Sequence, residues 1–200
     1  MNTLDQFTSN VEEIKKKVYL DVRTEAYSNI YTGNPVTDIL LSIGRTEINT
    51  CIETGTFMGN TTAFLSALFE KVHTVEKYIT QEKADKYKKI HSACPNIDFY
   101  NGDTIPLLSS ILDKTPDMTF AFWLDAYNGV SEVPLIEELE TIAVKSNKKD
   151  HVILIDDSFD MGMGQGNFPT FNEISNAALK INPNYKIIQT NYIRNIIAIY

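Results

Sequence analysis

The chain has 200 residues, of which 43% are apolar and 22% charged, as in one soluble globular domain. Its formal net charge is −8, which disfavours a nucleic-acid surface because such a surface needs a basic field. The first ten residues lack the apolar stretch of a secretory signal, and no apolar run reaches the ~20 residues of a membrane helix. We therefore expect a cytoplasmic protein without membrane or nucleic-acid partners.

The first segment is separated from the rest of the chain by glycine and proline. Residues 5–32 are charged and helix-like, and "GNPV" at 33–36 interrupts them. We expect residues 1–34 to form a helical segment that serves as a lid or as a homodimer contact. One domain, over residues 35–200, would follow and open with a short helix at 36–44.

Strand and helix patterns then alternate. Strands are expected at 48–54, 71–77, 97–103, 118–126 and 151–157, and helices at 59–70, 80–93, 104–112, 131–145 and 167–181. Such alternation predicts an α/β fold with a parallel sheet and helices on both faces. The chain finishes with two strands around a short turn at 191–195, and so short a link requires an antiparallel pair. The sheet would thus be mostly parallel, with one reversed strand.

Each of the first five predicted strands ends near an acidic residue. These residues are Glu53, Glu76, Asp103, Asp125 and, within "VILIDDSF", the adjacent pair Asp156 and Asp157. The carboxyl ends of parallel strands meet at one edge of the sheet, where ligands bind in folds of this kind. Polar residues also mark strand ends for structural reasons alone, but acids at five successive strand ends favour a ligand site.

The loop "ETGTFMG" at 53–59 joins the first strand to a helix. Its glycines, Gly55 and Gly59, would let the backbone approach a ligand near the free N–H groups of the helix start. The spacing is not G-x-G-x-x-G, so a pyrophosphate site is poorly supported. Glu76 ends the second strand, where an acid commonly accepts hydrogen bonds from both hydroxyls of a ribose. The alternative is an ion pair between Glu76 and Lys71 or Lys77.

These segments resemble the class I S-adenosylmethionine (SAM)-dependent methyltransferases over about residues 35–200. The motifs that carry the resemblance are E-T-G-T-F-M-G, V-E-K, N-G-D-T and W-L-D-A after the first four strands, together with the reversed last strand. Within that superfamily the chain is similar to small metal-dependent O-methyltransferases, especially the macrocin O-methyltransferase and cephalosporin-hydroxylase-like groups. The resemblance implies a Rossmann-like sheet of seven strands.

The resemblance also implies a cofactor site. Its cofactor-binding residues would be Glu53, Gly55, Thr56 and Gly59 at the methionine part of SAM, Glu76 at the ribose, Asp103 at the adenine, and Asp125. Asp125 would in addition be a catalytic residue and the first ligand of a divalent metal ion such as Mg²⁺. Asp156 and Asp157 would be the second and third metal ligands.

Physical reasoning supports a metal ion at three converging carboxylates. Such groups repel one another and raise their own pKa values, and a divalent cation that prefers oxygen ligands removes the repulsion. The metal would also lower the pKa of a bound hydroxyl and orient it for methyl transfer. The alternative for Asp156 and Asp157 is a turn or helix cap before Ser158.

The group that accepts the proton is left open. Related enzymes often carry Lys or Asp two or three residues after the first metal aspartate, where this chain has Tyr127 and Asn128. Asp160, or the metal alone, would have to serve, and we do not expect a catalytic histidine. The glycine-rich loop at 159–171 is expected to cover the substrate as a lid.

We therefore expect a SAM-dependent, divalent-metal-assisted O-methyltransferase that acts on a hydroxyl of a small molecule, such as a sugar or a catechol-like ring. Two alternatives remain. One is a non-catalytic SAM-binding protein, and the other is a nucleotide-dependent oxidoreductase.

Overall fold

The structure, a computed structural model, describes residues 39–40, 42–127, 133–158, 168–190 and 196–200. The predictions for the N-terminal segment 1–34, for Asn128 and Asp160, and for most of the loop at 159–171 lie outside these residues. None of the helices among the described residues is long and apolar enough to cross a membrane.

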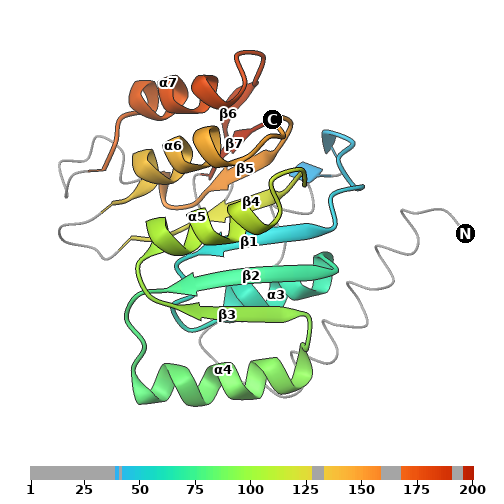
Figure 1. Ribbon diagram of the computed structural model, residues 1–200, viewed down its shortest axis with the longest axis vertical. Helices are drawn as coiled ribbons and strands as arrows, with labels where there is room; N and C mark the ends of the chain where they lie inside the picture. Colours follow the sequence, from blue (N-terminus) through green and yellow to red (C-terminus); the bar gives the residue numbers. More distant parts are fainter. Residues whose placement is uncertain (1–38, 41, 128–132, 159–167, 191–195) are drawn as a thin grey trace, which may run out of the picture.

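Seven strands form one sheet within the described residues, in the order β3-β2-β1-β4-β5-β7-β6 (Figure 1). Their bounds are β1 (Thr50–Thr54), β2 (Lys71–Glu76), β3 (Ile97–Asn101), β4 (Ala121–Leu124), β5 (Val152–Ile155), β6 (Ile187–Thr190) and β7 (Ile196–Ile199). The first five strands pair in parallel, whereas β7 runs antiparallel to both of its neighbours, β5 and β6. The predicted fold class, an α/β Rossmann-like sheet with a reversed C-terminal strand, is confirmed.

Helices cover both faces of the sheet. They are α3 (Asn60–Leu68), α4 (Gln81–Ala93), α5 (Thr104–Lys114), α6 (Leu135–Lys145) and α7 (Phe171–Ile181). Figure 1 shows α5, α6 and α7 side by side in front of the sheet, α3 behind it, and α4 beyond the β3 edge. The first four strand-to-strand connections therefore each contain a helix, as parallel neighbours require.

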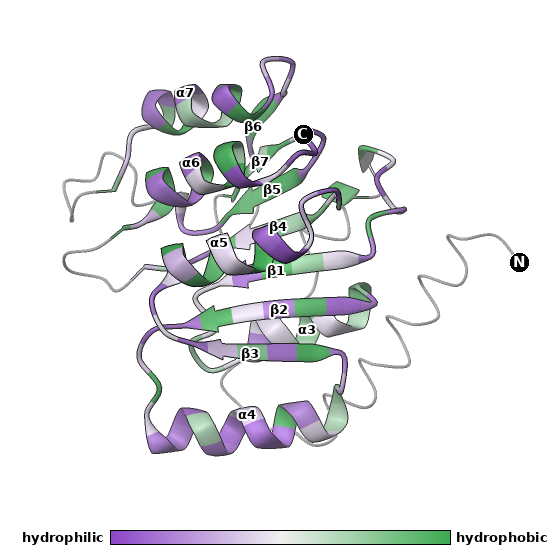
Figure 2. Ribbon diagram, viewed as in Figure 1, coloured by the Kyte–Doolittle hydropathy of each residue, from purple (hydrophilic) through white to green (hydrophobic). Residues whose placement is uncertain are grey.

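The central strands are buried because helices shield the sheet from both sides. All residues of β1, β4, β5 and β7 are buried, whereas the edge strand β6 is partly exposed. In Figure 2, β5 is green and α4 is largely purple, in keeping with a covered strand and a helix at the rim. A strand buried on both faces reads as a continuous apolar run instead of an alternating one.

Two hydrophobic clusters lie on opposite faces of the sheet. Ile52 and Phe122 point to the face of α5, α6 and α7, whereas Cys51 and Trp123 point to the face of α3. Successive residues of a strand alternate between faces, so each central strand contributes to both clusters. Trp123 is 5% exposed, which confirms the prediction that it belongs to the core.

Several predicted boundaries were too wide. The strand expected at 118–126 spans Ala121–Leu124, and the helix expected at 131–145 starts at Leu135. Pro134 is the N-cap of that helix and its carbonyl accepts the hydrogen bond of Glu138 N–H. Because Pro has no N–H of its own to place in the helix, it suits a helix start, and α6 begins there.

Candidate functional site

A cavity of about 460 Å³ opens at the carboxyl ends of β1, β2 and β4. Its size lies in the range of roughly 300–1,000 Å³ that is common for small-molecule sites. The cavity is next to the point where the strand order reverses, between β1 and β4. Its lining consists of Gly55, Phe57, Val75, Glu76, Lys77, Tyr78, Lys83, Asp103, Thr104, Asp125, Ala126, Tyr127, Pro134 and Asp157.

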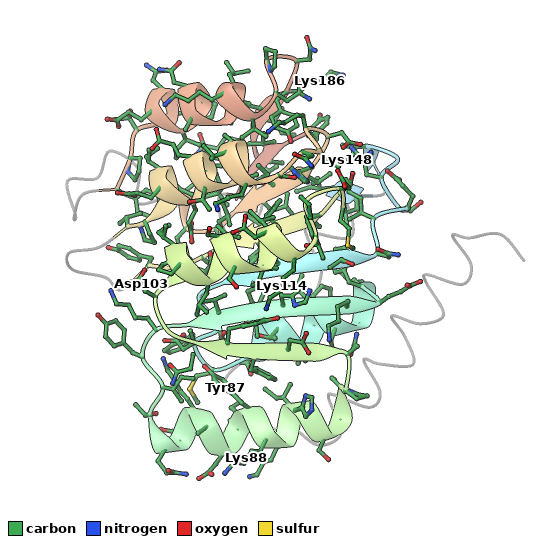
Figure 3. All side chains as sticks on the ribbon, in the orientation of Figure 1. Tyr87, Lys88, Asp103, Lys114, Lys148 and Lys186 are labelled. Carbon is green, nitrogen blue, oxygen red and sulfur yellow. The ribbon has the colours of Figure 1, made fainter. Side chains whose placement is uncertain are left out.

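The predicted site residues divide into two groups. Five of them line the cavity, namely Gly55, Glu76, Asp103, Asp125 and Asp157. Glu53, Thr56, Gly59 and Asp156 are not in its lining. In Figure 3, Asp103 lies at the edge where β2 and β3 end, and Lys148 lies at the opposite edge. None of the three histidines is among the described residues that line the cavity.

Glu76 lies at the end of β2 with its carboxylate surrounded by donors. Its Oε1 accepts hydrogen bonds from Lys83 Nζ at 3.0 Å and Tyr78 N at 2.9 Å, and its Oε2 accepts one from Phe57 N at 2.8 Å. Its ion-pair partner is thus Lys83, not Lys71 or Lys77 as the alternative interpretation supposed. Glu76 connects the loops after β1 and β2, which are both walls of the cavity.

Lys71 and Lys77 have other partners. Lys71 pairs with Asp98 at 2.6 Å, and Lys77 pairs with Asp103 at 3.1 Å. Asp103 is also the N-cap of α5, where its side chain accepts a hydrogen bond from Ile105 N at 3.3 Å. One carboxylate therefore starts a helix and lines the cavity.

Glu53 is fully buried behind the cavity wall. Its Oε2 accepts hydrogen bonds from Thr62 and Thr74, both at 2.5 Å, and Thr74 also contacts Thr56 at 2.6 Å between hydroxyl oxygens. Its Oε1 has no hydrogen-bond partner among the described residues. Burial raises the pKa of Glu53 to about 7. This network joins β1, β2 and α3, and so supports the loop that reaches the cavity.

The two glycines of the "ETGTFMG" loop have positive φ angles, and both lie against neighbouring elements. Gly59 has φ +74°, and a Cβ atom there would lie 2.7 Å from Ile90 Cδ1 of α4. Gly55 has φ +85° and lies against the backbone of Asp125, while also lining the cavity. We expected both glycines to admit a ligand, but Gly59 lies where α4 packs.

Asp125, Asp156 and Asp157 lie at the neighbouring ends of β4 and β5. Asp156 is 2% exposed and its Oδ1 accepts a hydrogen bond from Asp157 N at 2.9 Å. All three line a second, smaller pocket of about 10 Å³. Within the described ranges, no group of three or more His, Cys, Asp or Glu side chains is placed to hold a metal ion. The three-aspartate metal site therefore stays a prediction.

Glu138 of α6 lines the same small pocket and was missed by the sequence analysis. It is 1% exposed, and its Oε1 has no hydrogen-bond partner in the described part of the chain. Burial raises the pKa of Glu138 to about 8. Helical spacing could have found it, because Glu138 falls on the stripe of Leu135, Leu139 and Ile142.

Lys83 and two aromatic residues also went unnoticed. Phe57 and Tyr78 line the cavity although they are 63% and 56% exposed. Lys83 reaches the cavity from the first turn of α4, with Nζ 5.3 Å from the centre of the Phe57 ring. The charge-rich sequence around Lys83 indicated only an exposed helix, so it offered no signal for this inward side chain.

No protein-family model matches the sequence, and a search of curated proteins gives no significant match. Solved structures of methyltransferases share its Rossmann-like fold. An O-methyltransferase from Bacillus cereus in complex with S-adenosylhomocysteine (SAH) has a TM-score of 0.60 and 18% identity, over 96% of this chain and 90% of that one.

Two further solved structures are similar over most of both chains. The SAH-bound methyltransferase PaMTH1 from Podospora anserina has a TM-score of 0.58 and 10% identity, over 98% of this chain and 87% of its own. The second is the O-methyltransferase TomG from Streptomyces achromogenes, which is involved in tomaymycin synthesis and was solved in complex with SAM. It has a TM-score of 0.54 and 13% identity, over 95% of this chain and 87% of its own. At these identities the similarity establishes the fold.

Proposed function

We propose that the protein transfers the methyl group of SAM to a hydroxyl group of a small molecule. The observation that carries this proposal is the position of Glu76, which lines a cavity at the carboxyl end of the second strand. An acid there is placed to hold the ribose of a nucleoside cofactor. The shared fold with methyltransferases that have SAM or SAH bound supports the choice of cofactor.

The cofactor would extend along the cavity from Asp125 to Asp103. Gly55 and Asp125 would border its methionine part, Glu76 its ribose and Asp103 its adenine, each of them a lining residue. Glu53, Thr56 and Gly59 would act on this site indirectly, since they hold the loop between β1 and α3 in place.

The acceptor would bind at the end of the cavity that Tyr127, Pro134 and Asp157 line. A sugar or a catechol-like ring, with a hydroxyl next to another oxygen, is the class of acceptor we propose. Tyr127 packs edge-on against Phe168, with ring centres 5.6 Å apart, so its ring is held in place at this wall. Methyl transfer needs the attacking oxygen and the methyl group in line, and fixed walls supply that alignment.

A divalent cation is a separate part of the proposal. Asp125 and Asp157 line the cavity, but the described side chains do not gather three ligands for a metal ion. We therefore assign no step of the reaction to the cation. If it binds, it would supply a positive charge beside the acceptor hydroxyl and lower the pKa of that group.

Calorimetric titration with SAH tests the cofactor assignment. We expect saturable binding of SAH and none of NAD, and Glu76→Ala should weaken SAH binding at least about tenfold because a buried, charged acceptor is lost. Asp98→Ala is the matched control, since it removes an acid of β3 that is not in the cavity lining. Equal affinities of wild type and Glu76→Ala would refute the ribose assignment.

Methyl transfer itself is measured with isotopically labelled SAM and a panel of sugars and catechols. Transfer to a hydroxyl supports the proposed O-methyltransferase activity, and loss of transfer in EDTA supports the proposed role of a divalent cation. Binding of SAH without transfer to any hydroxyl would instead favour the non-catalytic alternative. Binding of NAD in place of SAH would favour the oxidoreductase.

A further inference from the structure

Lys83 binds the end of β2 and the loop that follows it, at the proposed nucleoside end of the cavity. It lies in the first turn of α4, and its side chain is 13% exposed. Its Nζ donates to Glu76 Oε1 at 3.0 Å and to the carbonyl oxygen of Tyr78 at 2.8 Å. It also lines the cavity, so a ligand held by Glu76 would lie next to its ammonium group.

The hydrogen-bond capacity of Glu76 is nearly used. A carboxylate offers about four acceptor positions, two on each oxygen. Oε1 already receives Lys83 and Tyr78, and Oε2 receives Phe57. In this arrangement Oε2 has one acceptor position left, so Glu76 accepts from one ribose hydroxyl and not from two.

The ammonium group of Lys83 has the complementary capacity. It carries about three N–H donors and no acceptor. Two of them point to Glu76 Oε1 and to the Tyr78 carbonyl oxygen, which leaves a third for a ligand in the cavity. A ribose hydroxyl is both a donor and an acceptor, so the hydroxyl that Glu76 cannot accept from can itself accept from Lys83.

We propose that Glu76 and Lys83 together recognise the vicinal hydroxyl pair of the cofactor's ribose. Glu76 Oε2 accepts from one hydroxyl, and Lys83 Nζ donates to the oxygen of the other. This inference rests on the proposed function and adds a specificity-determining residue to it. The alternative is that Lys83 only holds the loop between β2 and α4 in place, in which case its removal affects every ligand of the cavity alike.

The test measures coupling between Lys83 and single hydroxyl groups. Affinities of SAH and its 2′-deoxy and 3′-deoxy analogues are measured by calorimetry for the wild type and Lys83→Met, which removes the ammonium group and keeps an unbranched side chain of nearly the same length. We expect Lys83→Met to weaken SAH about tenfold, as for a charged hydrogen bond. It should change the affinity for one of the two deoxy analogues by less than about twofold, because that analogue lacks the partner hydroxyl.

Matched variants separate recognition from support of the loop. Lys86→Met removes a neighbouring lysine of α4 that donates to Asn60 and is not in the cavity lining, so all three ligands should keep their wild-type affinities. Lys83→Arg should recover part of the SAH affinity, and Lys83→Ala should give the same pattern as Lys83→Met. Thermal melts check that each variant is folded.

The outcomes distinguish this inference from the proposed function. If Lys83→Met and Lys83→Ala weaken all three ligands by the same factor, Lys83 only supports the loop and the inference is wrong. If the wild type does not bind SAH, the proposed function fails, and the inference fails with it. Binding of SAH with selective loss of one hydroxyl contact supports both.

Discussion

Gly55 and Asp125 are in direct backbone contact at the centre of the sheet's carboxyl edge. A Cβ atom on Gly55 would lie 2.1 Å from the carbonyl oxygen of Asp125. The N–H of Asp125 in turn donates to the carbonyl oxygen of Thr54 at 3.0 Å. The first turn after β1 and the end of β4 therefore form one unit, and a side chain at position 55 would force them apart.

Gly55→Ala should destabilise the fold by at least about 2 kcal/mol more than Gly44→Ala. Both glycines have positive φ, +85° and +69°, but a Cβ on Gly44 meets nothing within 4 Å. The control thus carries the backbone strain without the clash. Urea denaturation of both variants measures the difference in the free energy of unfolding, and equal losses would contradict the contact.

Stability should fall as pH rises from about 5 to 8. Burial raises the pKa of Glu53 to about 7 and that of Glu138 to about 8, so both carboxyl groups keep a proton in the folded state that the unfolded chain loses near the ordinary pKa of 4.5. Because the folded state binds more protons in this range, the free energy of unfolding decreases with pH, by up to about 1.4 kcal/mol per pH unit for each proton.

Glu138→Gln should flatten this pH dependence and stabilise the protein at pH 8 relative to wild type. The amide cannot lose a proton, so the cost of a buried charge disappears. Glu140→Gln, a change at an exposed residue of α6 that leaves Glu138 and its neighbour Glu137 in place, is the control and should keep the wild-type slope. Chemical denaturation at several pH values gives the slopes, and an unchanged slope in Glu138→Gln would show that its proton is not retained.

Asp103 allows its two roles to be separated by substitution. Asp103→Ala removes the N-cap of α5 and should cost about 1 kcal/mol of stability as well as weaken SAH binding. Asp103→Asn keeps a capping oxygen but removes the charge that pairs with Lys77, so stability should stay within about 0.5 kcal/mol of wild type. Thermal melts and SAH titration, run on both variants, assign each effect, and equal stabilities of Asp103→Ala and wild type would refute the capping role.

The metal prediction is tested by stability in Mg²⁺. If Asp157 is a ligand, millimolar Mg²⁺ should raise the melting temperature of the wild type and not that of Asp157→Asn. Asn is chosen because Asp157 has φ +55°, a conformation that Asn adopts more readily than Ala. Asp113→Asn, at a surface ion pair with Lys145, should respond to Mg²⁺ as the wild type does. An equal response of all three proteins would exclude Asp157 as a ligand.

Much of the fold was predictable because its signals are local. Apolar strand runs alternate with helix patterns, and the short link between β6 and β7 requires an antiparallel pair. The carboxyl ends of the strands then locate the cavity, and with it Glu76, Asp103 and Asp125. Their place at strand ends indicated a ligand site, and the resemblance to methyltransferases supplied the role expected of each.

The remaining site residues depend on tertiary packing. Lys83 comes from an exposed, charged helix, and only the position of α4 relative to β2 brings it to Glu76. Glu53 ends a strand as Glu76 does, but its side chain points to the α3 face and is closed off by Thr62. The position at a strand end predicted both Glu53 and Glu76 as site residues, whereas the facing helix determines which of the two lines the cavity.

The strand order has a consequence for the folding reaction. β1 pairs with β2 on one side and with β4 on the other, although Ala121 of β4 lies far along the chain from its partner Cys51. In a partly folded sheet of β1, β2 and β3, the edge of β1 that later pairs with β4 is an unpaired template for strands of other molecules. We therefore expect slow folding through a long-range step, and aggregation that increases with protein concentration when refolding is interrupted before β4 docks.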